Sequence, residues 1–157
     1  AAVLKTPEYK RIRIPLKCYS REQRVDDQRH EEHASYEQQD EIFQRFVERY
    51  PNLKCIARHV RYAHSGSENS LKAFMWYQGH TFESKLFTFN ILDRVGGGDS
   101  FASGLIYGLM TTGDVEKAVN YGAAHGALAM TTPGDTSMAS LKEVEAIMGG
   151  AGARVKR

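Results

Sequence analysis

The chain has 157 residues, of which 41% are hydrophobic and 25% charged, and its formal net charge is +2. This make-up is typical of a globular domain and argues against a disordered chain, and its balanced charge gives no reason to expect nucleic acid or an anionic membrane as a partner. No segment approaches the roughly 20 apolar residues of a membrane span, and the first residues lack the apolar core of a signal peptide. We therefore expect a cytoplasmic protein that binds neither nucleic acid nor membranes.

The chain opens with a segment, residues 1–34, that shows no clear pattern beyond a short alternation in KRIRIPLKCY. We leave this segment unassigned, with rearranged or non-native sequence as one explanation. His30 and His33 lie beside two glutamates and could hold a metal ion on a helix, but an exposed polar face explains them more simply. From Tyr36 to Tyr50 apolar residues recur at helical spacing, which predicts an amphipathic helix that ends at the next residue, a proline.

Two or three strands are predicted after this helix. Leu53 to Tyr62 reads as a buried strand, AHSGSEN as a turn and SLKAFMWY as the return strand, and a Gln-Gly turn then leads into HTFESKLFTFNIL. Three consecutive glycines follow, and behind them lie three helical segments, SFASGLIYGLMTT, VEKAVNYGAAHGALAM and SLKEVEAIM. The order of helix, strands, glycine-rich turn and three helices predicts an α/β layer protein.

The glycines belong to the segment DRVGGGDSF, residues 93–101, between the last strand and a helix. A glycine-rich turn that opens a helix leaves several backbone N–H groups unpaired, and the helix dipole adds partial positive charge at the same end. Glycine lets a phosphate approach this backbone closely, and it tolerates a positive φ. Asp99 lies beside the turn, where a carboxylate can accept the proton of a hydroxyl that attacks a phosphoryl group.

Two simpler explanations apply to this motif when it is taken alone. Asp99 can be the N-cap of the helix, and the glycines can serve only the shape of the turn. The motif is not a P-loop, because no GK[ST] follows, and it does not match the dinucleotide-binding pattern GxGxxG. The choice therefore depends on the surrounding sequence.

Residues 93–106, DRVGGGDSFASGLI, resemble the C-terminal signature of the ribokinase-like carbohydrate kinases, or phosphofructokinase-B family. An alanine-rich helix such as AVNYGAAHGALAM and a loop such as TTPGD follow the signature in that family. The helix EIFQRFVERYPNLK and the GARVKR tail are most similar to 2-keto-3-deoxygluconate kinases, and the likeness extends over residues 36–157. It implies the C-terminal part of a three-layer α/β/α fold, with helices packed on a mixed sheet and residues 35–157 forming the nucleotide-binding part.

The resemblance also implies a reaction and its participants. The expected activity is ATP-dependent phosphorylation of a sugar hydroxyl, with Mg²⁺ carried by ATP. The substrate that the resemblance favours is 2-keto-3-deoxygluconate, which would be converted to its 6-phosphate. The partners would be ATP and a sugar or sugar acid, and a longer parent protein would form a homodimer. Two alternatives remain: another sugar kinase of the fructokinase or ribokinase type, or a truncated nucleotide-binding fragment without catalytic activity.

Particular residues take on roles through this resemblance. Asp99 is the implied catalytic base, and the backbone amides of Gly96, Gly97 and Gly98 are the implied anion hole for the γ-phosphate. Asp93 and Val95 stand where family members hold a monovalent cation such as K⁺ through backbone oxygens. The residues that stand near the implied adenine pocket are Asn120, Ala123, Ala124 and Gly134.

Two arginines on the first predicted strand are candidates for pairing with ATP phosphates. We expect Arg58 to make this contact in preference to Arg61. The alternative for both is a surface arginine whose side chain packs on the sheet. The chain departs from the family at Arg94, where most members have a small residue or threonine. It also lacks a recognisable glycine-rich sugar motif and an NxxE motif for magnesium.

Overall fold

The structure is a computed structural model that describes residues 36–150, all of them in the second of the two units, residues 31–157, into which the chain divides. The predictions made for residues 1–34, including the histidine pair there, lie outside the described residues, and so does the GARVKR tail. Helix α2, Tyr36–Arg49, confirms the predicted amphipathic helix. Its Phe43 is only 1% exposed and packs on the sheet, whereas the opposite side of the helix is polar.

The sheet is built around one long central strand. Strand β1, Cys55–Ala63, pairs antiparallel with β2, Glu68–Tyr77, along its whole length. The other edge of β2 pairs with β3, His80–Glu83, at one end and with β4, Phe87–Asn90, at the other. Every pairing among the described strands is antiparallel, so the expectation of a mixed sheet is wrong for this part of the chain.

The segment HTFESKLFTFNIL forms two strands because of Ser84. The backbone N–H of Ser84 donates to the carbonyl oxygen of Ala73, and its side-chain Oγ accepts from the Ala73 N–H at 2.9 Å. The serine side chain thus takes the place of a backbone carbonyl in the ladder. The next two residues leave the sheet, and β4 rejoins β2 further along.

Three helices follow the sheet, as predicted. Helix α3, Gly97–Thr112, ends at Gly113, whose φ is +65°, and α4, Val115–Ala129, starts behind the N-cap Asp114. Helix α5, Leu141–Met148, starts with a capping box between Ser140 and Glu143. None of the described helices is long and apolar enough to cross a membrane.

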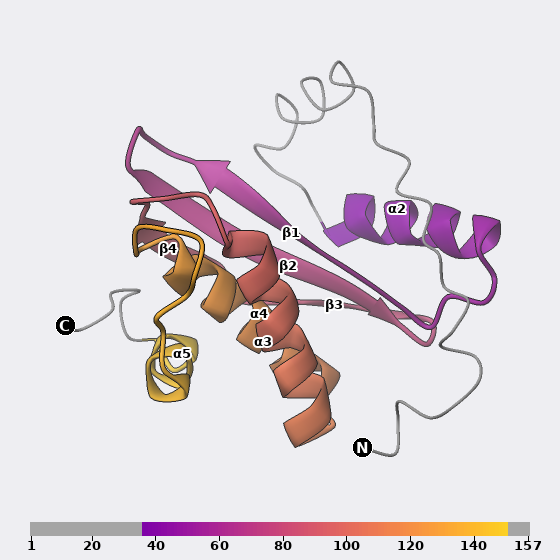
Figure 1. The fold of residues 1–157 in the computed structure, drawn as a ribbon. Helices are drawn as coiled ribbons and strands as arrows, with labels where there is room; N and C mark the ends of the chain where they lie inside the picture. The colour runs from indigo at the N-terminus through magenta and orange to yellow at the C-terminus, as the bar shows by residue number, and fades with distance from the viewer. Residues whose placement is uncertain (1–35, 151–157) are drawn as a thin grey trace. The chain divides into compact units, whose positions relative to one another are not determined.

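The helices cover both faces of the sheet, which gives three layers (Figure 1). On one face α2 packs against side chains at alternate positions of β1 and β2, among them Val60, Phe74 and Trp76. On the other face α3, α4 and α5 enclose the larger core, which contains Leu71, Met75 and many alanines of α4. The α/β class and the α/β/α layering predicted from the sequence are confirmed.

Candidate phosphate-binding and catalytic site

The glycine-rich turn leads directly into α3. Gly96 is the N-cap and has a left-handed backbone, with φ at +79°. A Cβ added to Gly96 would lie 2.2 Å from the carbonyl oxygen of Asp135, so a neighbouring loop fills the space that a side chain would need. Gly96 is therefore required by the fold itself, for its conformation and for its close packing.

Gly97 and Gly98 form the first turn of the helix, which starts three residues earlier than the apolar pattern predicts. The first helical hydrogen bond runs from the N–H of Ser100 to the carbonyl oxygen of Gly96. Within residues 36–150, the N–H groups of Gly96, Gly97, Gly98 and Asp99 donate to no acceptor. Four adjacent donors at the positive end of a 16-residue helix are thus available to an anion.

Gly98 differs from its two neighbours because the protein leaves it room. A Cβ at Gly97 would contact the side chain of Met130 at 3.1 Å, whereas a Cβ at Gly98 would have no atom within 4 Å. Gly98 has no positive φ, and it is exposed. Nothing among the described residues explains a glycine at this position.

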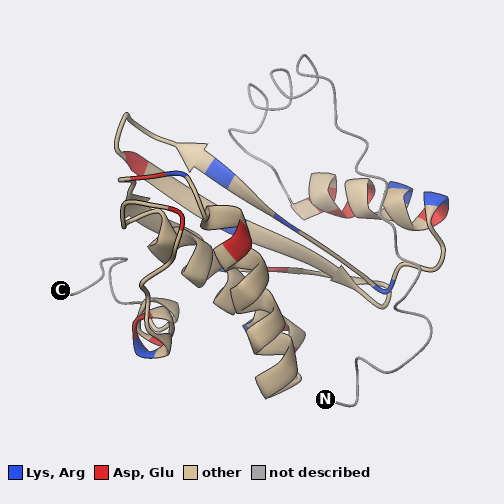
Figure 2. Cartoon of the chain, viewed as in Figure 1, with Lys and Arg blue, Asp and Glu red and all other residues tan. Residues whose placement is uncertain are grey.

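Asp99 is the third residue of α3 and is exposed. The alternative that it is the N-cap is wrong, because Gly96 holds that position and no side chain caps the helix. In the described part of the chain, the Asp99 carboxylate takes part in no hydrogen bond or ion pair. Figure 2 shows an acidic residue near the start of α3, the end that carries the free N–H groups.

Asp93 joins the turn to a second loop. Its Oδ1 accepts hydrogen bonds from the N–H groups of Arg94 at 2.7 Å and Val95 at 3.1 Å, and its Oδ2 accepts one from the N–H of Gly134 at 3.0 Å. These bonds, with that of Gly134 the most important, hold the pKa of the Asp93 carboxyl below its ordinary value. Asp93, Val95 and Gly134 therefore lie together beside the three glycines.

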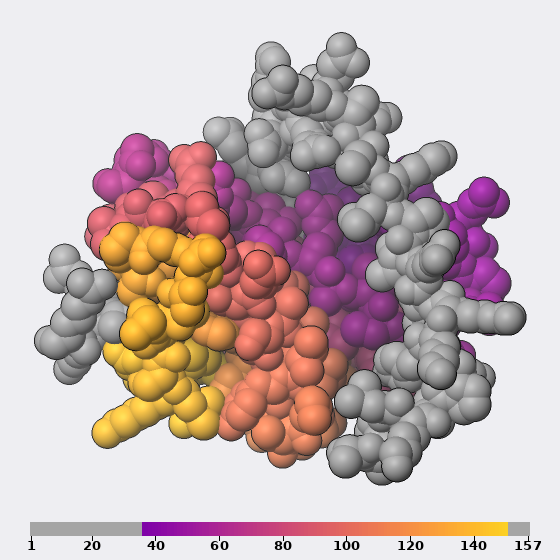
Figure 3. Space-filling view, viewed as in Figure 1, coloured from indigo at the N-terminus to yellow at the C-terminus, as the bar shows by residue number. Residues whose placement is uncertain are grey.

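The loop between α4 and α5 packs against the glycine-rich turn, and their surfaces meet in Figure 3. The carbonyl oxygen of Met130 accepts the N–H groups of Leu92 and Asp93. On the other side of the turn, the N–H of Ile91 donates to the carbonyl oxygen of Ser67 in the β1–β2 connection. Three connections thus converge on the N-terminus of α3.

The alternation of β1 separates its two arginines. Arg58 faces the same side of the sheet as Val60, which is the side that α2 covers. The side chain of Arg61 points to the opposite side, where it donates to Oδ1 of Asn69. The sheet therefore lies between the Arg58 side chain and α3, so the structure gives no support to the expected phosphate contact of Arg58, which stays a prediction.

Arg61 lies on the face of the sheet that α3 covers and toward the end of β1 that leads into the β1–β2 connection. The ring of His59, two residues before it, is 5.0 Å from the ring of Phe101 in α3. Two residues span about 6.6 Å of strand, so Arg61 lies beyond this contact, nearer the connection that holds Ile91. Sequence reasoning ranked Arg61 second because it could not fix the strand's parity.

Two histidines near α3 are partly buried. Burial, and then the charges of Arg58 and Arg61, lower the pKa of His59. His125 in α4 forms a 2.9 Å hydrogen bond with the hydroxyl of Ser137, and burial lowers its pKa in spite of a hydrogen bond with the backbone of Ser100. His125 thus connects the first turn of α3 to the loop before α5.

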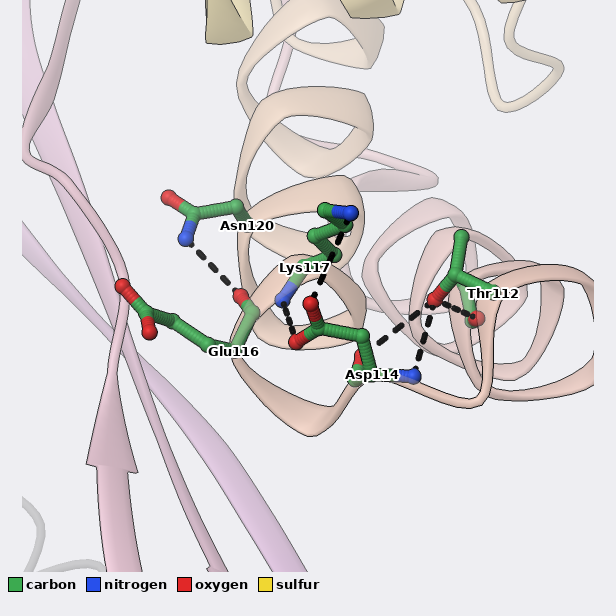
Figure 4. A network of polar contacts seen from close by, with 6 residues as sticks. Thr112, Asp114, Glu116, Lys117 and Asn120 are labelled. Atoms are coloured by element: carbon green, nitrogen blue, oxygen red, sulfur yellow. Dashed lines mark hydrogen bonds and ion pairs between the residues drawn. The ribbon is translucent and has the colours of Figure 1, made fainter.

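The residues predicted for the adenine pocket do not lie together in the structure. Gly134 lies at the turn, but Ala123 and Ala124 are 0% exposed in the core, so their side chains reach no surface. Asn120 accepts the N–H of Lys85 and donates to the carbonyl oxygen of Glu116, as Figure 4 shows for the second bond. The predicted adenine contacts of Asn120, Ala123 and Ala124 are not supported.

The described residues offer no ready metal cluster. Within residues 36–150, no three or more His, Cys, Asp or Glu side chains come together in a way that could hold a metal ion. The carbonyl oxygens of Asp93 and Val95 accept no hydrogen bond from a backbone N–H in this part of the chain, and the monovalent cation expected there stays a prediction. Magnesium would accompany the ATP phosphates.

Parts of this chain are similar to curated kinases. A 5-dehydro-2-deoxygluconokinase of Geobacillus kaustophilus is 38% identical over 68 residues, which are 43% of this chain and 20% of the relative. A 2-dehydro-3-deoxygalactonokinase of Haloferax volcanii is 34% identical over 79 residues, which are 50% of this chain and 25% of the relative. The chain thus spans only about a fifth to a quarter of the curated relatives it matches.

A solved structure shows the same fold. The crystal structure of 2-dehydro-3-deoxygluconokinase from Thermotoga maritima matches with a TM-score of 0.69 and 32% identity, over 74% of this chain and 35% of that one. The sequence pattern of the pfkB family carbohydrate kinases matches residues 30–142, which is more than half of the chain. The chain therefore belongs to the pfkB carbohydrate kinase family.

Proposed function

We propose that this chain is the nucleotide-binding part of a kinase that transfers the γ-phosphoryl group of Mg·ATP to a sugar hydroxyl. The predicted anion hole, the N–H groups of Gly96, Gly97 and Gly98, binds the transferring phosphoryl group together with the N–H of Asp99, and the left-handed backbone of Gly96 fixes the turn that aims them. The sugar oxygen attacks the γ-phosphorus, the bond from this phosphorus to the β–γ bridging oxygen breaks, and ADP leaves. Asp99 accepts the proton of the attacking hydroxyl.

Gly98 is the observation that carries this proposal. Its backbone is helical and a side chain would meet nothing, so a protein without a ligand here would gain stability from alanine. The Cα–Cβ bond of a helical residue tilts toward the N-terminus of the helix. A methyl group at Gly98 would therefore lie beside the free N–H groups, where it would hinder a phosphate.

Asp99 suits the role of base by its position and its lack of partners. It is exposed next to the N–H groups, and no described residue occupies its carboxylate. A general base must lie within hydrogen-bond reach of the proton it accepts. The proposal requires that a sugar hydroxyl in line with a phosphate at the N–H groups lie within that reach.

Arg61 is the basic residue that the geometry favours for the phosphates. It shares the sheet face with α3, and its hydrogen bond to Asn69 holds the guanidinium in place. Asn69 is 0% exposed, so the partner itself is fixed by the core. A guanidinium can form two parallel hydrogen bonds with phosphate oxygens.

The proposed substrate is 2-keto-3-deoxygluconate, phosphorylated at its 6-hydroxyl. The relatives' names refer to dehydro-deoxy sugar acids of the gluconate and galactonate series, which supports this class. Another sugar kinase of the family is the alternative for the whole protein. For the chain alone, a nucleotide-binding fragment without turnover is the second candidate, favoured by its small share of the relatives' length.

A coupled assay for ADP tests the proposal. The chain is incubated with Mg·ATP and, in turn, with 2-keto-3-deoxygluconate, its galactonate isomer, 5-dehydro-2-deoxygluconate, fructose and ribose. ADP release that depends on 2-keto-3-deoxygluconate supports the full proposal. Nucleotide binding without release for any sugar favours the fragment, and a chain that binds no nucleotide contradicts both.

A further inference from the structure

The carboxylate of Asp93 connects two segments that lie far apart in the sequence. One oxygen accepts the N–H groups of Arg94 and Val95, which shapes the turn before the glycines. The other oxygen accepts the N–H of Gly134, 41 residues away, in the loop between α4 and α5. An ionised carboxylate only accepts hydrogen bonds, and bonds to it are stronger than those between neutral groups.

The loop held by Asp93 is the one that sets the backbone of Gly96. The carbonyl oxygen of Asp135, the residue after Gly134, lies where a Cβ of Gly96 would be. The N–H of Asp93 itself donates to the carbonyl oxygen of Met130, at the start of the same loop. A change at the Asp93–Gly134 bond would therefore move the residue that aims the N–H groups of α3.

We propose that Asp93 is a positioning residue for the phosphate-binding turn, acting through its side-chain bond to Gly134. This inference rests on the proposed function, because it assumes that the N–H groups of α3 bind ATP phosphates. The carboxylate acts directly on the backbone N–H groups of both segments. A monovalent cation held by the backbone oxygens of Asp93 and Val95 is not needed for this tie.

The test uses the whole chain and two kinds of variant. Asp93→Asn keeps one oxygen for Arg94 and Val95 but presents an NH₂ group to the N–H of Gly134, so it breaks only the bond between the loops. Asp93→Ala removes all three bonds. Asp114→Ala is the matched control, since Asp114 also accepts a backbone N–H, that of Lys117, but at the start of α4.

Two measurements test separately whether Asp93 joins the two loops and whether this bond positions the phosphate-binding turn. Amide hydrogen exchange reports on the tie without nucleotide, and we expect exchange at Gly134 to rise at least about tenfold in both Asp93 variants. Exchange at Val95 should rise only in Asp93→Ala. Calorimetric titration with Mg·ATP, in potassium and in tetramethylammonium chloride, reports on positioning.

For positioning, Asp93→Asn is expected to weaken ATP binding about tenfold in both salts, with little change in the thermal midpoint. Asp114→Ala is expected to lower the midpoint and leave the affinity unchanged. Unchanged exchange at Gly134 in Asp93→Asn would refute the tie. Faster exchange at Gly134 with wild-type ATP affinity would leave Asp93 only a structural role. The same conclusion would follow if Asp93→Asn weakened ATP binding in potassium chloride but not in tetramethylammonium chloride.

A wild-type chain that binds no Mg·ATP in either salt would contradict the proposed function, and the positioning role would fall with it. The exchange data still show in that case whether Asp93 joins the two loops. The titration with Mg·ATP therefore tests the proposed function, and amide exchange at Gly134 tests the bond between the loops, so the two failures can be told apart.

Discussion

The carbonyl oxygen of Asp135 occupies the space beside Gly96, 2.2 Å from where a Cβ would be. Gly96→Ala therefore adds a backbone clash to the strain of a φ of +79°. A left-handed backbone costs a non-glycine residue about 1–2 kcal/mol, and we expect the total loss of unfolding free energy in urea to exceed this. Gly113→Ala is the control, because Gly113 has a φ of +65° but open space around it. Equal losses of unfolding free energy in the two variants would contradict the prediction, because the loop at Asp135 would then move aside without cost.

Arg61 and Arg58 form a matched pair on opposite faces of β1. Arg61→Ala is expected to weaken Mg·ATP binding about tenfold, since a charged hydrogen bond contributes about 1.5–3 kcal/mol when it is formed. Arg58→Ala is expected to leave the affinity unchanged, because its side chain lies on the α2 side of the sheet. Titration calorimetry of the two variants checks this, and the opposite ranking would refute the assignment of Arg61.

Asp99→Asn separates binding from chemistry. In a form of this protein that phosphorylates sugar, removal of the base is expected to lower turnover by about 10²–10⁴-fold, while ATP affinity is retained because the N–H groups remain. Glu116→Gln, in the first turn of α4, is the control for the lost interaction with a helix dipole, about 0.3–1 kcal/mol. Near wild-type turnover of Asp99→Asn would contradict the role of base.

The lowered pKa values of His59 and His125 lead to a prediction of how stability changes with pH. Burial lowers both pKa values in the folded protein below the ordinary value of 6.5, so the unfolded chain binds protons more readily. The stability from the neutral rings is complete above pH 6.5 and is lost as the pH falls through the folded pKa values. Unfolding in urea at pH 7.5 and 5.5 should show this loss, and His125→Gln should reduce it, whereas His80→Gln, at an exposed position, should not. A pH-independent difference between wild type and His125→Gln would contradict the prediction.

The sequence alone predicts the elements with clear periodic patterns or end signals. The helix from Tyr36 was found to within one residue, and Gly113 and Asp114 mark the boundary between α3 and α4 as expected. The start of α3 was missed because glycine is a poor helix former, yet Gly97 and Gly98 are helical. The break between β3 and β4 depends on a side-chain bond of Ser84 to Ala73, which a local pattern cannot reveal.

The site was predictable where it is local in sequence and not where it depends on tertiary contacts. Gly96, Gly98 and Asp99 are neighbours in one motif, so their juxtaposition follows from the chain itself. The choice between Arg58 and Arg61 required the strand's parity relative to α3, and the burial of Ala123 required the packing of α4 against the sheet. The bond from Asp93 to Gly134 spans 41 residues, and no pattern in the sequence indicates it.

The most direct test of the phosphate-binding turn is calorimetric titration of Mg·ATP into wild type, Gly98→Ala and Gly149→Ala, with urea unfolding of each. We expect Gly98→Ala to be about 0.5–1 kcal/mol more stable than wild type and yet to bind Mg·ATP at least about tenfold more weakly. Gly149→Ala, which adds a methyl group after α5, should bind as wild type does. A Gly98→Ala variant that binds Mg·ATP as tightly as wild type would contradict the binding of phosphate at this turn.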